Sequence, residues 1–243
     1  MPQALPILTF HHLGENGYPP SLFKATLSRL HSAGYTTIDL VTGVKQLKAG
    51  TRLPNKCFVI TFDDGYQSTY EIAAPLLDEL GFTATLFPIN VKAHAESSRP
   101  MFEGRPLLTK KEIRLLAQNG HAIGSHTLDH HDLRSLTLDE AARQLDESRD
   151  QWQQLLGSSI ESFAYPYGLL NMKIRALVQE RFSCACGTQL ALNDSTCDPY
   201  ELNRVDMEFF NKKALTSLIF APGFSAYLWA RRKWLPNTWK YST

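Results

Sequence analysis

The sequence predicts an α/β protein built as a distorted (β/α) barrel of seven or eight units, either closed or incomplete. Short apolar runs alternate along the chain with longer segments of helical period, which is typical of parallel strands joined by crossover helices. About seven such units fit into 243 residues, and this number favours a barrel over an open sheet. Because no Gly/Ser-rich or Pro-rich linker divides the chain, we expect one domain over residues 1–243.

Strands and helices alternate in the first half of the chain. "PILTFHHL" predicts the first strand and "SLFKATLSRLHSAG" the first amphipathic helix. "KCFVITF" is the next clear strand, followed by the helix "YEIAAPLLDELG", which ends at Gly81. "TATLFPIN" follows as a strand. The helix "TKKEIRLLAQNG" then begins at a capping box formed by Thr109 and Glu112.

The second half continues the same alternation. "HAIGSH" predicts a strand, and "TLDEAARQLDESRDQWQQLLG" predicts a long helix with a second capping box, from Thr137 to Glu140. "SFAYPYG" is the next strand and "NMKIRALVQERF" the next helix. The strands "SCACGTQ" and "ELNRVDM" complete the series.

The overall charge and the cysteines exclude some classes of protein. Twenty-five basic and twenty-four acidic residues give a net charge of +1, so nothing in the charge supports nucleic acid as a partner. The four cysteines lack the spacing of zinc or redox pairs, and we expect free thiols in a reducing compartment. The first residues show no basic start and no long apolar core of a secretory signal, so we expect a cytoplasmic protein.

Residues 214–243 are predicted to form a helical extension with basic and aromatic residues. Pro222 and Gly223 interrupt the apolar stretch "ALTSLIFAPGFSAYLWA", which "RRKW" follows. No spanning helix is therefore indicated. The segment fits either a last helix packed on the core with a solvated basic end or a peripheral contact with the inner face of a membrane.

Two acidic residues, Asp63 and Asp64, follow the apolar run of the strand "KCFVITF" directly. Gly65 then permits a tight exit from the strand. Because neighbouring side chains on a strand point to opposite sides, we expect different roles for the two carboxylates. One would reach a metal, and the other would face substrate or water. An ordinary Asp-Gly turn is the alternative.

The segment "SHTLDHHDL" contains a second candidate site. His126 and His130 are separated by three residues, so one helical turn or a tight loop would bring both imidazoles to one face. Such a pair suits zinc and similar ions, and with one carboxylate it would leave positions open for water and substrate. His131 is a substitute ligand or a bystander, and His121, inside the strand, is expected to be structural.

Two further strand ends carry candidate residues. In "FAYPYG", a stiff Pro-Tyr-Gly loop could present a backbone N–H to a developing oxyanion. In "TFHHL", His11 and His12 are adjacent, and one of them would point inward as a general acid or as a structural histidine. All four groups lie at predicted strand ends, so in a barrel they should meet on one rim.

The two main motifs also resemble those of a known family. "TFDDG" (61–65) and "SHTLDH" (125–130) are similar, in order and spacing, to the first and second motifs of the NodB-type polysaccharide deacetylases, carbohydrate esterase family 4. The resemblance covers residues 5–210 and implies the same barrel fold. It implies a hydrolase acting on C–N bonds other than peptide bonds, which removes N-acetyl groups from an amino sugar and releases acetate.

The resemblance also implies the roles of the site residues. Asp63 would be the general base, and Asp64 would bind the metal with His126 and His130. The backbone N–H of Tyr167 would stabilise the oxyanion. The divalent ion would be zinc in the first place, with cobalt, nickel and manganese as alternatives. The expected partner is an N-acetylated glycan.

The chain departs from the family pattern at two places. Ala164 stands where the third motif usually has an arginine that orients the base, and we expect Arg204, at a later strand end, to supply the guanidinium. The late Leu-x-His motif is absent, because no histidine follows His131. "LTFHHL" is similar to the first-strand pattern of circularly permuted members, so His11 is the expected acid, with His12 in reserve.

Two other functions remain open on the sequence alone. One is a metal-dependent deformylase or amidase acting on a lipid-linked sugar, since the motifs define the metal chemistry better than the acyl group. The other is a glycan-binding pseudoenzyme that has kept the fold without turnover, which the missing arginine and histidine make worth testing.

Overall fold

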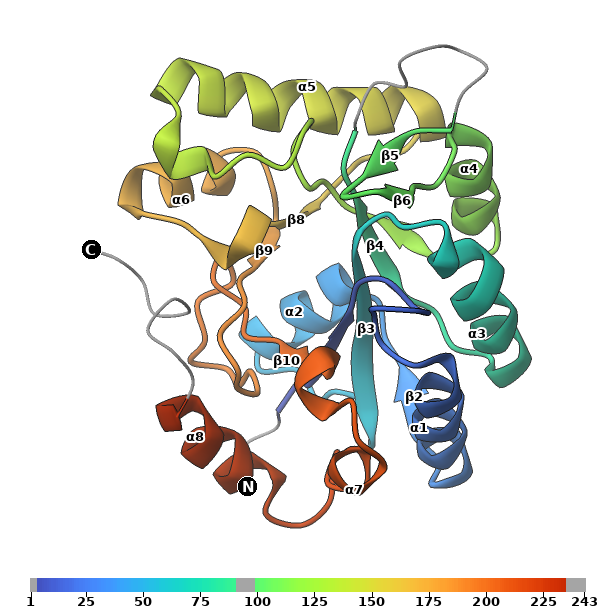
Figure 1. Cartoon of the computed structure of the whole chain (residues 1–243). Helices are drawn as coiled ribbons and strands as arrows, with labels where there is room; N and C mark the ends of the chain where they lie inside the picture. The colour runs from blue at the N-terminus through green and yellow to red at the C-terminus, as the bar shows by residue number, and fades with distance from the viewer. Residues whose placement is uncertain (1–3, 91–98, 235–243) are drawn as a thin grey trace.

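Parallel strands form the continuous part of the sheet, in the order β10–β1–β3–β4–β7 (Figure 1). The computed structural model describes residues 4–90 and 99–234. In register, Leu8 of β1 lies between Val205 of β10 and Ile60 of β3, and Phe62 of β3 lies beside Leu86 of β4. These strands are β1 (Ile7–Phe10), β3 (Cys57–Asp64), β4 (Thr85–Pro88), β7 (Ala122–Ile123) and β10 (Val205–Asp206).

Two more parallel strands, β8 (Ser162–Ala164) and β9 (Cys184–Cys186), complete the ring. A parallel bridge between Ser125 and Phe163 joins the segment after β7 to β8, and another between Cys186 and Leu202 joins β9 to the segment before β10. The strands therefore close into a barrel through single bridges rather than continuous ladders. This confirms the predicted distorted (β/α) barrel.

Six main helices surround the strands, and α5 crosses one end of the molecule in Figure 1. The capping box of α4 is confirmed, because Thr109 and Glu112 each accept from the other's backbone N–H. The predicted second capping box is only half present. The Thr137 side chain accepts from the amide of Glu140, as predicted, but the Glu140 carboxylate binds Arg143 and not the amide of Thr137. The helices are α1 (Pro20–Ser32), α2 (Leu40–Lys48), α3 (Ala74–Leu80), α4 (Lys110–Gln118), α5 (Leu138–Leu156) and α6 (Met172–Gln179).

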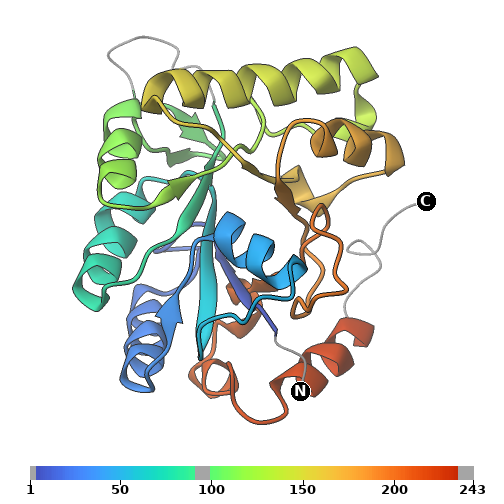
Figure 2. The ribbon, with the colours of Figure 1, turned by 180° about the vertical axis from the view of Figure 1, so that it is seen from behind.

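The helices bury their apolar faces against the strands of the barrel. Seen from behind, α2 lies between β3 and the β8–β9 pair (Figure 2). Its buried residues Leu40, Val44 and Leu47 belong to a cluster that includes residues of β1, β3, β8 and β9. The burial of such side chains, each of which stabilises the fold by about 1.5–3 kcal/mol, holds the strand ends in place.

Several short elements were not predicted from the sequence. A hairpin of β5 (Met101–Phe102) and β6 (Arg105–Pro106) precedes α4, and β2 (Thr36–Thr37) pairs with the beginning of β3. The helix expected over residues 70–81 divides into a π-helical turn (Thr69–Ala73) and α3, because Pro75 has no amide to continue the hydrogen-bond ladder. The remaining turns are 3₁₀ helices at Leu133–Ser135, Pro166–Gly168 and Met207–Phe210.

The C-terminal extension packs on the barrel as far as the structure describes it. It contains α7 (Lys213–Thr216) and α8 (Phe224–Trp234), and Phe224 and Leu228 of α8 are buried. Arg231 turns back and donates to the carbonyl of Phe209 at 3.1 Å. Residues 235–243 lie outside the described part, and within that part no helix is long and apolar enough to cross a membrane.

Candidate metal-dependent active site

A cavity of about 330 Å³ lies where the barrel strands end, and both acids of β3 line it. The expected alternation of the two side chains was wrong, because Asp64 leaves the strand conformation at φ 66° and turns into the same cavity as Asp63. Gly65 follows at φ 78°, and a Cβ there would lie 2.7 Å from Cβ of Pro88. The turn therefore requires glycine and lets neighbouring carboxylates share one cavity with different partners.

Asp64, His126 and His130 form a compact cluster of buried ligand atoms. Oδ1 of Asp64 lies 3.5 Å from Nε2 of His126 and 3.4 Å from Nε2 of His130. One ligand atom from each residue fits within 4.8 Å of the other two. This is the group that the sequence assigned to a metal, and its spacing could hold one ion.

The hydrogen bonds of His126 test whether the cluster fits a cation. Nδ1 of His126 donates to the carbonyl oxygen of Ala164 at 2.7 Å, so in the neutral imidazole Nε2 carries a lone pair. That lone pair faces Oδ1 of Asp64, which is also an acceptor. Two buried acceptors pointing at one place fit a metal ion between them, and the Ala164 carbonyl fixes the ring as metal-bound histidines require.

The two histidines are brought together by a loop and not by a helix. His130 follows Thr127 in a turn in which both have positive φ, 68° for Thr127 and 62° for His130. The amide of His130 donates to Oγ1 of Thr127 at 3.0 Å, and the amide of Leu128 donates to Oε1 of Gln144 at 3.0 Å. Of the alternatives from the sequence, the tight loop is confirmed.

The charge states of the cluster also suit metal binding. Burial works to raise the pKa of Asp64, but the surrounding histidines His126, His11 and His130 together outweigh it and lower the pKa. Burial, helped by the charge of His126, lowers the pKa of His130 to about 4. Near neutral pH Asp64 is therefore an anion and His130 a neutral imidazole, which are the forms that bind metals.

Arg204 holds the other acid, Asp63, in a buried bidentate pair. Its Nη1 and Nη2 donate to Oδ1 and Oδ2 of Asp63 at 2.7 and 2.6 Å, and its Nε donates to the carbonyl of Gly187 at 2.7 Å. Burial raises the pKa of Asp63, but the guanidinium outweighs it and holds the pKa well below its usual range. The arginine that Ala164 does not supply thus reaches the acid from the position directly before β10.

His11 lines the same cavity and lies among carboxylates. Its Nε2 lies 4.0 Å from Oδ2 of Asp63, and its Nδ1 lies 4.0 Å from Oε1 of Glu208. Burial works to lower its pKa, but the charges of Asp206, Asp63, Asp64 and Glu208 together raise it above the ordinary value. The imidazolium form is therefore favoured, as a proton donor requires.

His12, the reserve candidate for the acid, has a different environment. Its Nδ1 is 3.2 Å from Oγ of Ser68, and its ring packs edge-on against Tyr66. Burial and the charge of Arg105 lower its pKa. Because the neutral form is favoured there and the ring is used in packing, His11 fits the role of acid better.

Tyr167 is placed by a strained turn at the cavity edge. It has φ 58°, unusual for a bulky residue, and its ring packs against His130 with centroids 4.4 Å apart. The turn is closed by the amides of Gly168 and Leu169, which donate to Tyr165 and Pro166, and the amide of Tyr167 takes no part in these bonds. This agrees with the expected backbone donor.

The two remaining histidines considered from the sequence, His121 and His131, do not line the cavity. His121 is buried, and its Nδ1 accepts from the amide of Ala84 at 3.2 Å, which agrees with the expected structural role. The exposed His131 has its Nδ1 2.6 Å from Oδ1 of Asp129 and is not in the metal cluster.

The sequence motifs did not single out several residues of the cavity wall. Asp206 is the last residue of β10 and Glu208 follows two residues later, so the strand-end rule that found Asp63 could have found them too. Tyr66 directly follows the "TFDDG" segment, whereas nothing in the sequence indicated the hairpin. The additional lining residues include Asn16, Tyr66, Phe102, Glu103, Arg105, Asp206 and Glu208.

The fold and this cavity define a class of protein: a parallel α/β barrel with a candidate metal site at its strand ends. The polysaccharide deacetylase family model matches residues 50–181, more than half of the chain. The chain belongs to the polysaccharide deacetylase family, as its two motifs indicated.

Individual relatives agree with this assignment. The chain is 28% identical over 208 residues to YxkH of Bacillus subtilis, covering 84% of this chain and 71% of that one. It is 28% identical over 193 residues to the poly-β-1,6-N-acetyl-D-glucosamine N-deacetylase of Staphylococcus epidermidis, covering 75% of this chain and 65% of the relative's length. The Streptococcus pyogenes deacetylase PplD, solved with acetate, shares the fold with a TM-score of 0.77 at 22% identity, covering 85% and 93% of the two chains.

Proposed function

We propose that this chain is a metal-dependent N-deacetylase that hydrolyses the acetamido group of an amino sugar in a glycan and releases acetate. The proposal rests on one observation: the two acidic residues at the end of β3 have different partners. Asp64 belongs to the ligand cluster with His126, and Asp63 is held ionised by Arg204 in the same cavity. Family membership supports the same reaction.

Asp64, His126 and His130 would hold the ion. Two imidazoles and one carboxylate suit zinc first, and cobalt, nickel or manganese are the alternatives. When bound, a divalent ion acidifies water and polarises a carbonyl oxygen. That property matters for Asp63, because a carboxylate whose pKa is held so low accepts a proton only from a strongly acidified donor.

Side-chain and backbone groups of the protein carry out the proton transfers and stabilise the developing charge. Asp63 takes the proton of the attacking water, and Arg204 fixes the orientation of its carboxylate. The backbone N–H of Tyr167 stabilises the negative charge that develops on the acetamide oxygen. His11 protonates the leaving amine when the C–N bond breaks, so acetate and a free amino sugar are formed.

We infer that the substrate is a polymer of N-acetylglucosamine. The support is the name of the staphylococcal relatives, which act on poly-β-1,6-N-acetyl-D-glucosamine, and this chain covers 65% of the first of them. A formyl or other acyl group and a lipid-linked sugar are the alternative substrates.

The test is acetate release from β-1,6-linked N-acetylglucosamine oligomers by the metal-loaded full chain. We expect release by the unaltered protein, with a loss of at least about a hundredfold in Asp63→Asn and His11→Ala. Glu79→Gln, an exposed change on α3, serves as the control. If the protein binds one equivalent of metal and releases no acetate from any oligomer, the acyl group is different or the chain is a glycan-binding pseudoenzyme.

A further inference from the structure

Strained backbone gathers at the catalytic cavity. Among the described residues other than glycine, positive φ occurs at Asn16, Lys56, Asp64, Glu103, Thr127, His130, Tyr167 and Phe220. Five of these eight line the cavity: Asn16, Asp64, Glu103, His130 and Tyr167. Such conformations cost free energy for most side chains, although asparagine adopts them more readily than other residues, so their gathering at one cavity calls for a hypothesis of function.

The proposed chemistry accounts for three of the five. Asp64 and His130 turn into the metal cluster, and Tyr167 lines the cavity with an amide that takes no part in closing its turn, as the proposed oxyanion donor requires. Asn16 and Glu103 have no part in the reaction. Both are exposed, so no buried packing explains their conformation.

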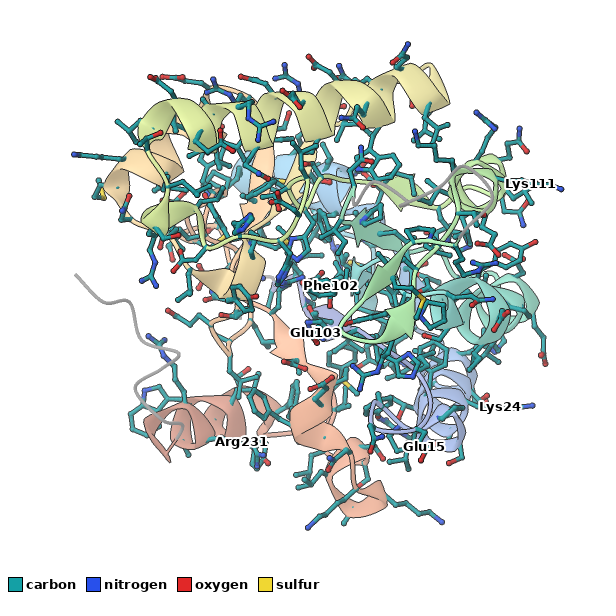
Figure 3. All side chains as sticks on the ribbon, turned by 45° about the horizontal axis from the view of Figure 1, so that its top comes forward. Glu15, Lys24, Phe102, Glu103, Lys111 and Arg231 are labelled. Carbon is teal, nitrogen blue, oxygen red and sulfur yellow. The ribbon has the colours of Figure 1, made fainter. Side chains whose placement is uncertain are left out.

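Glu103 occupies the tip of the β5–β6 hairpin. The two central residues of its turn, Glu103 and Gly104, have φ 48° and 73°, a pattern that strongly favours Asn-Gly. Glutamate is a poor choice for the first position if only the turn matters. Figure 3 shows Glu103 and Phe102 on this hairpin over the middle of the molecule.

The hairpin is held against the cavity on two sides. The ring of Phe102 packs on His130 with centroids 5.1 Å apart. Nη2 of Arg105 donates to the carbonyl oxygen of Asn16 at 2.9 Å, and its guanidinium lies over the ring of Tyr66. Arg105 therefore ties the loop that carries Asn16 to the hairpin that carries Glu103, and the two strained residues lie on one mouth.

The electrostatic neighbours of Glu103 agree with this position. Burial raises the pKa of Tyr167, and the charge of Glu103 is the next contribution in the same direction. Burial likewise raises the pKa of Tyr66, with Asp64 and then Glu103 adding to it. Glu103 lines the same cavity as both tyrosines.

We propose that Asn16 and Glu103 form a sugar-binding subsite for a neutral unit of the glycan adjacent to the unit that loses its acetyl group. The carboxylate accepts hydrogen bonds from ring hydroxyls, and the amide of Asn16 donates and accepts. Tyr167, whose side chain is half exposed, offers the face on which the sugar packs. This proposal rests on the proposed function, and it makes the site one for oligomers and not for single sugars.

Two substitutions remove the side chains and keep the backbone. Glu103→Asn places the preferred residue in the turn, and Asn16→Gly keeps a residue that tolerates positive φ. In the metal-loaded full chain carrying Asp63→Asn, which prevents consumption of the glycan, calorimetry measures the binding of the β-1,6-linked N-acetylglucosamine pentamer and of the monosaccharide. Glu79→Gln is again the matched control.

We expect each variant to weaken pentamer binding by about fivefold or more and monosaccharide binding by less. Glu103→Asn should at the same time raise the melting temperature by about 2 °C, because the turn strain is relieved. Unchanged pentamer binding, or an equal loss on pentamer and monosaccharide, would overturn the subsite.

These measurements can contradict the subsite and the proposed function independently of each other. If the chain without Asp63→Asn releases no acetate but the two variants still weaken pentamer binding, the deacetylase is wrong and the subsite stands. If acetate is released and the variants bind the pentamer as tightly as the control does, the subsite is wrong and the deacetylase stands.

Discussion

Asp63 and Asp64 are neighbours in the chain but belong to different sets of partners. Asp63 is bound by Arg204, which lies 141 residues later and directly before β10, and Asp64 faces His126 and His130. The positive φ of Asp64 makes this division possible inside one cavity. Two carboxylates at one strand end can then differ in function because their surroundings differ.

The Asp63–Arg204 pair should dominate local stability. Arg204→Met leaves Asp63, 3% exposed, without its cation, so we expect the free energy of unfolding to fall by about 3–5 kcal/mol. Urea denaturation measures it. Arg143→Met, which removes an exposed pair with Glu140, should change little. A similarly small loss in Arg204→Met would show that water replaces the arginine.

The acid role of His11 predicts a direction in the pH dependence of kcat. A proton donor must be protonated, so activity should fall as the pH rises through the raised pKa of His11. Glu208→Gln removes one negative charge 4.0 Å from Nδ1 of His11, so the pKa falls and the alkaline limb moves to lower pH. Glu79→Gln should leave the limb in place. A limb that does not move, or that moves to higher pH, contradicts His11 as the acid.

At the scale of elements, the candidate catalytic residues lie at strand ends. One connection between the barrel strands has no helix. The chain from β9 to β10 returns without one, and a fully buried asparagine, Asn193, holds it. The side-chain amide of Asn193 donates to the carbonyls of Leu5 and Asn203, and its oxygen accepts from the amide of Asn203. These bonds stand in place of helix packing and support β10, which ends at Asp206.

Asn193→Ala should therefore destabilise the barrel at the connection from β9 to β10, which has no helix. Three hydrogen bonds are removed and buried backbone groups lose partners, so we expect a loss of about 2–4 kcal/mol in thermal or urea unfolding. Asn203→Ala removes one long side-chain bond, to Leu192 at 3.4 Å, and should cost less than half as much. Equal losses would mean that the asparagine side chain of Asn193 is not what closes the barrel.

At the scale of the whole molecule, metal binding should stabilise the fold, because the ligands come from distant parts of the chain. Asp64 is on β3, and the two histidines follow β7. With free zinc about 100 times above Kd, the stabilisation is about 3 kcal/mol, or about 6 °C in melting temperature. Differential scanning fluorimetry with and without zinc measures it.

The variants identify the ligands independently of activity. His126→Ala and His130→Ala should abolish the zinc-dependent shift, and His131→Ala, whose ring pairs with Asp129 outside the cluster, should keep it. If His131→Ala loses the shift as well, the ligand set inferred from the cluster is wrong.

Much of the site could be predicted because it lies at strand ends. The motifs carrying Asp63, Asp64, His126 and His130 are local, and a parallel barrel brings strand ends to one rim. The prediction that Arg204 would replace the arginine missing at Ala164 also agrees with the geometry. Glu103 and Asn16 gave no signal, because exposed turn residues carry no periodicity.

The sequence by itself determined the parallel α/β architecture, the chemistry of the acid and histidine motifs and the family, since periodicity, turn preference and motif spacing are local properties of the chain. Only the tertiary structure decided how the barrel closes, that Asp64 turns into the same cavity as Asp63, that Glu208 lies beside His11, and that the hairpin reaches the cavity mouth. These depend on burial, on backbone dihedrals and on contacts between residues far apart in sequence, which exist only once the chain is packed.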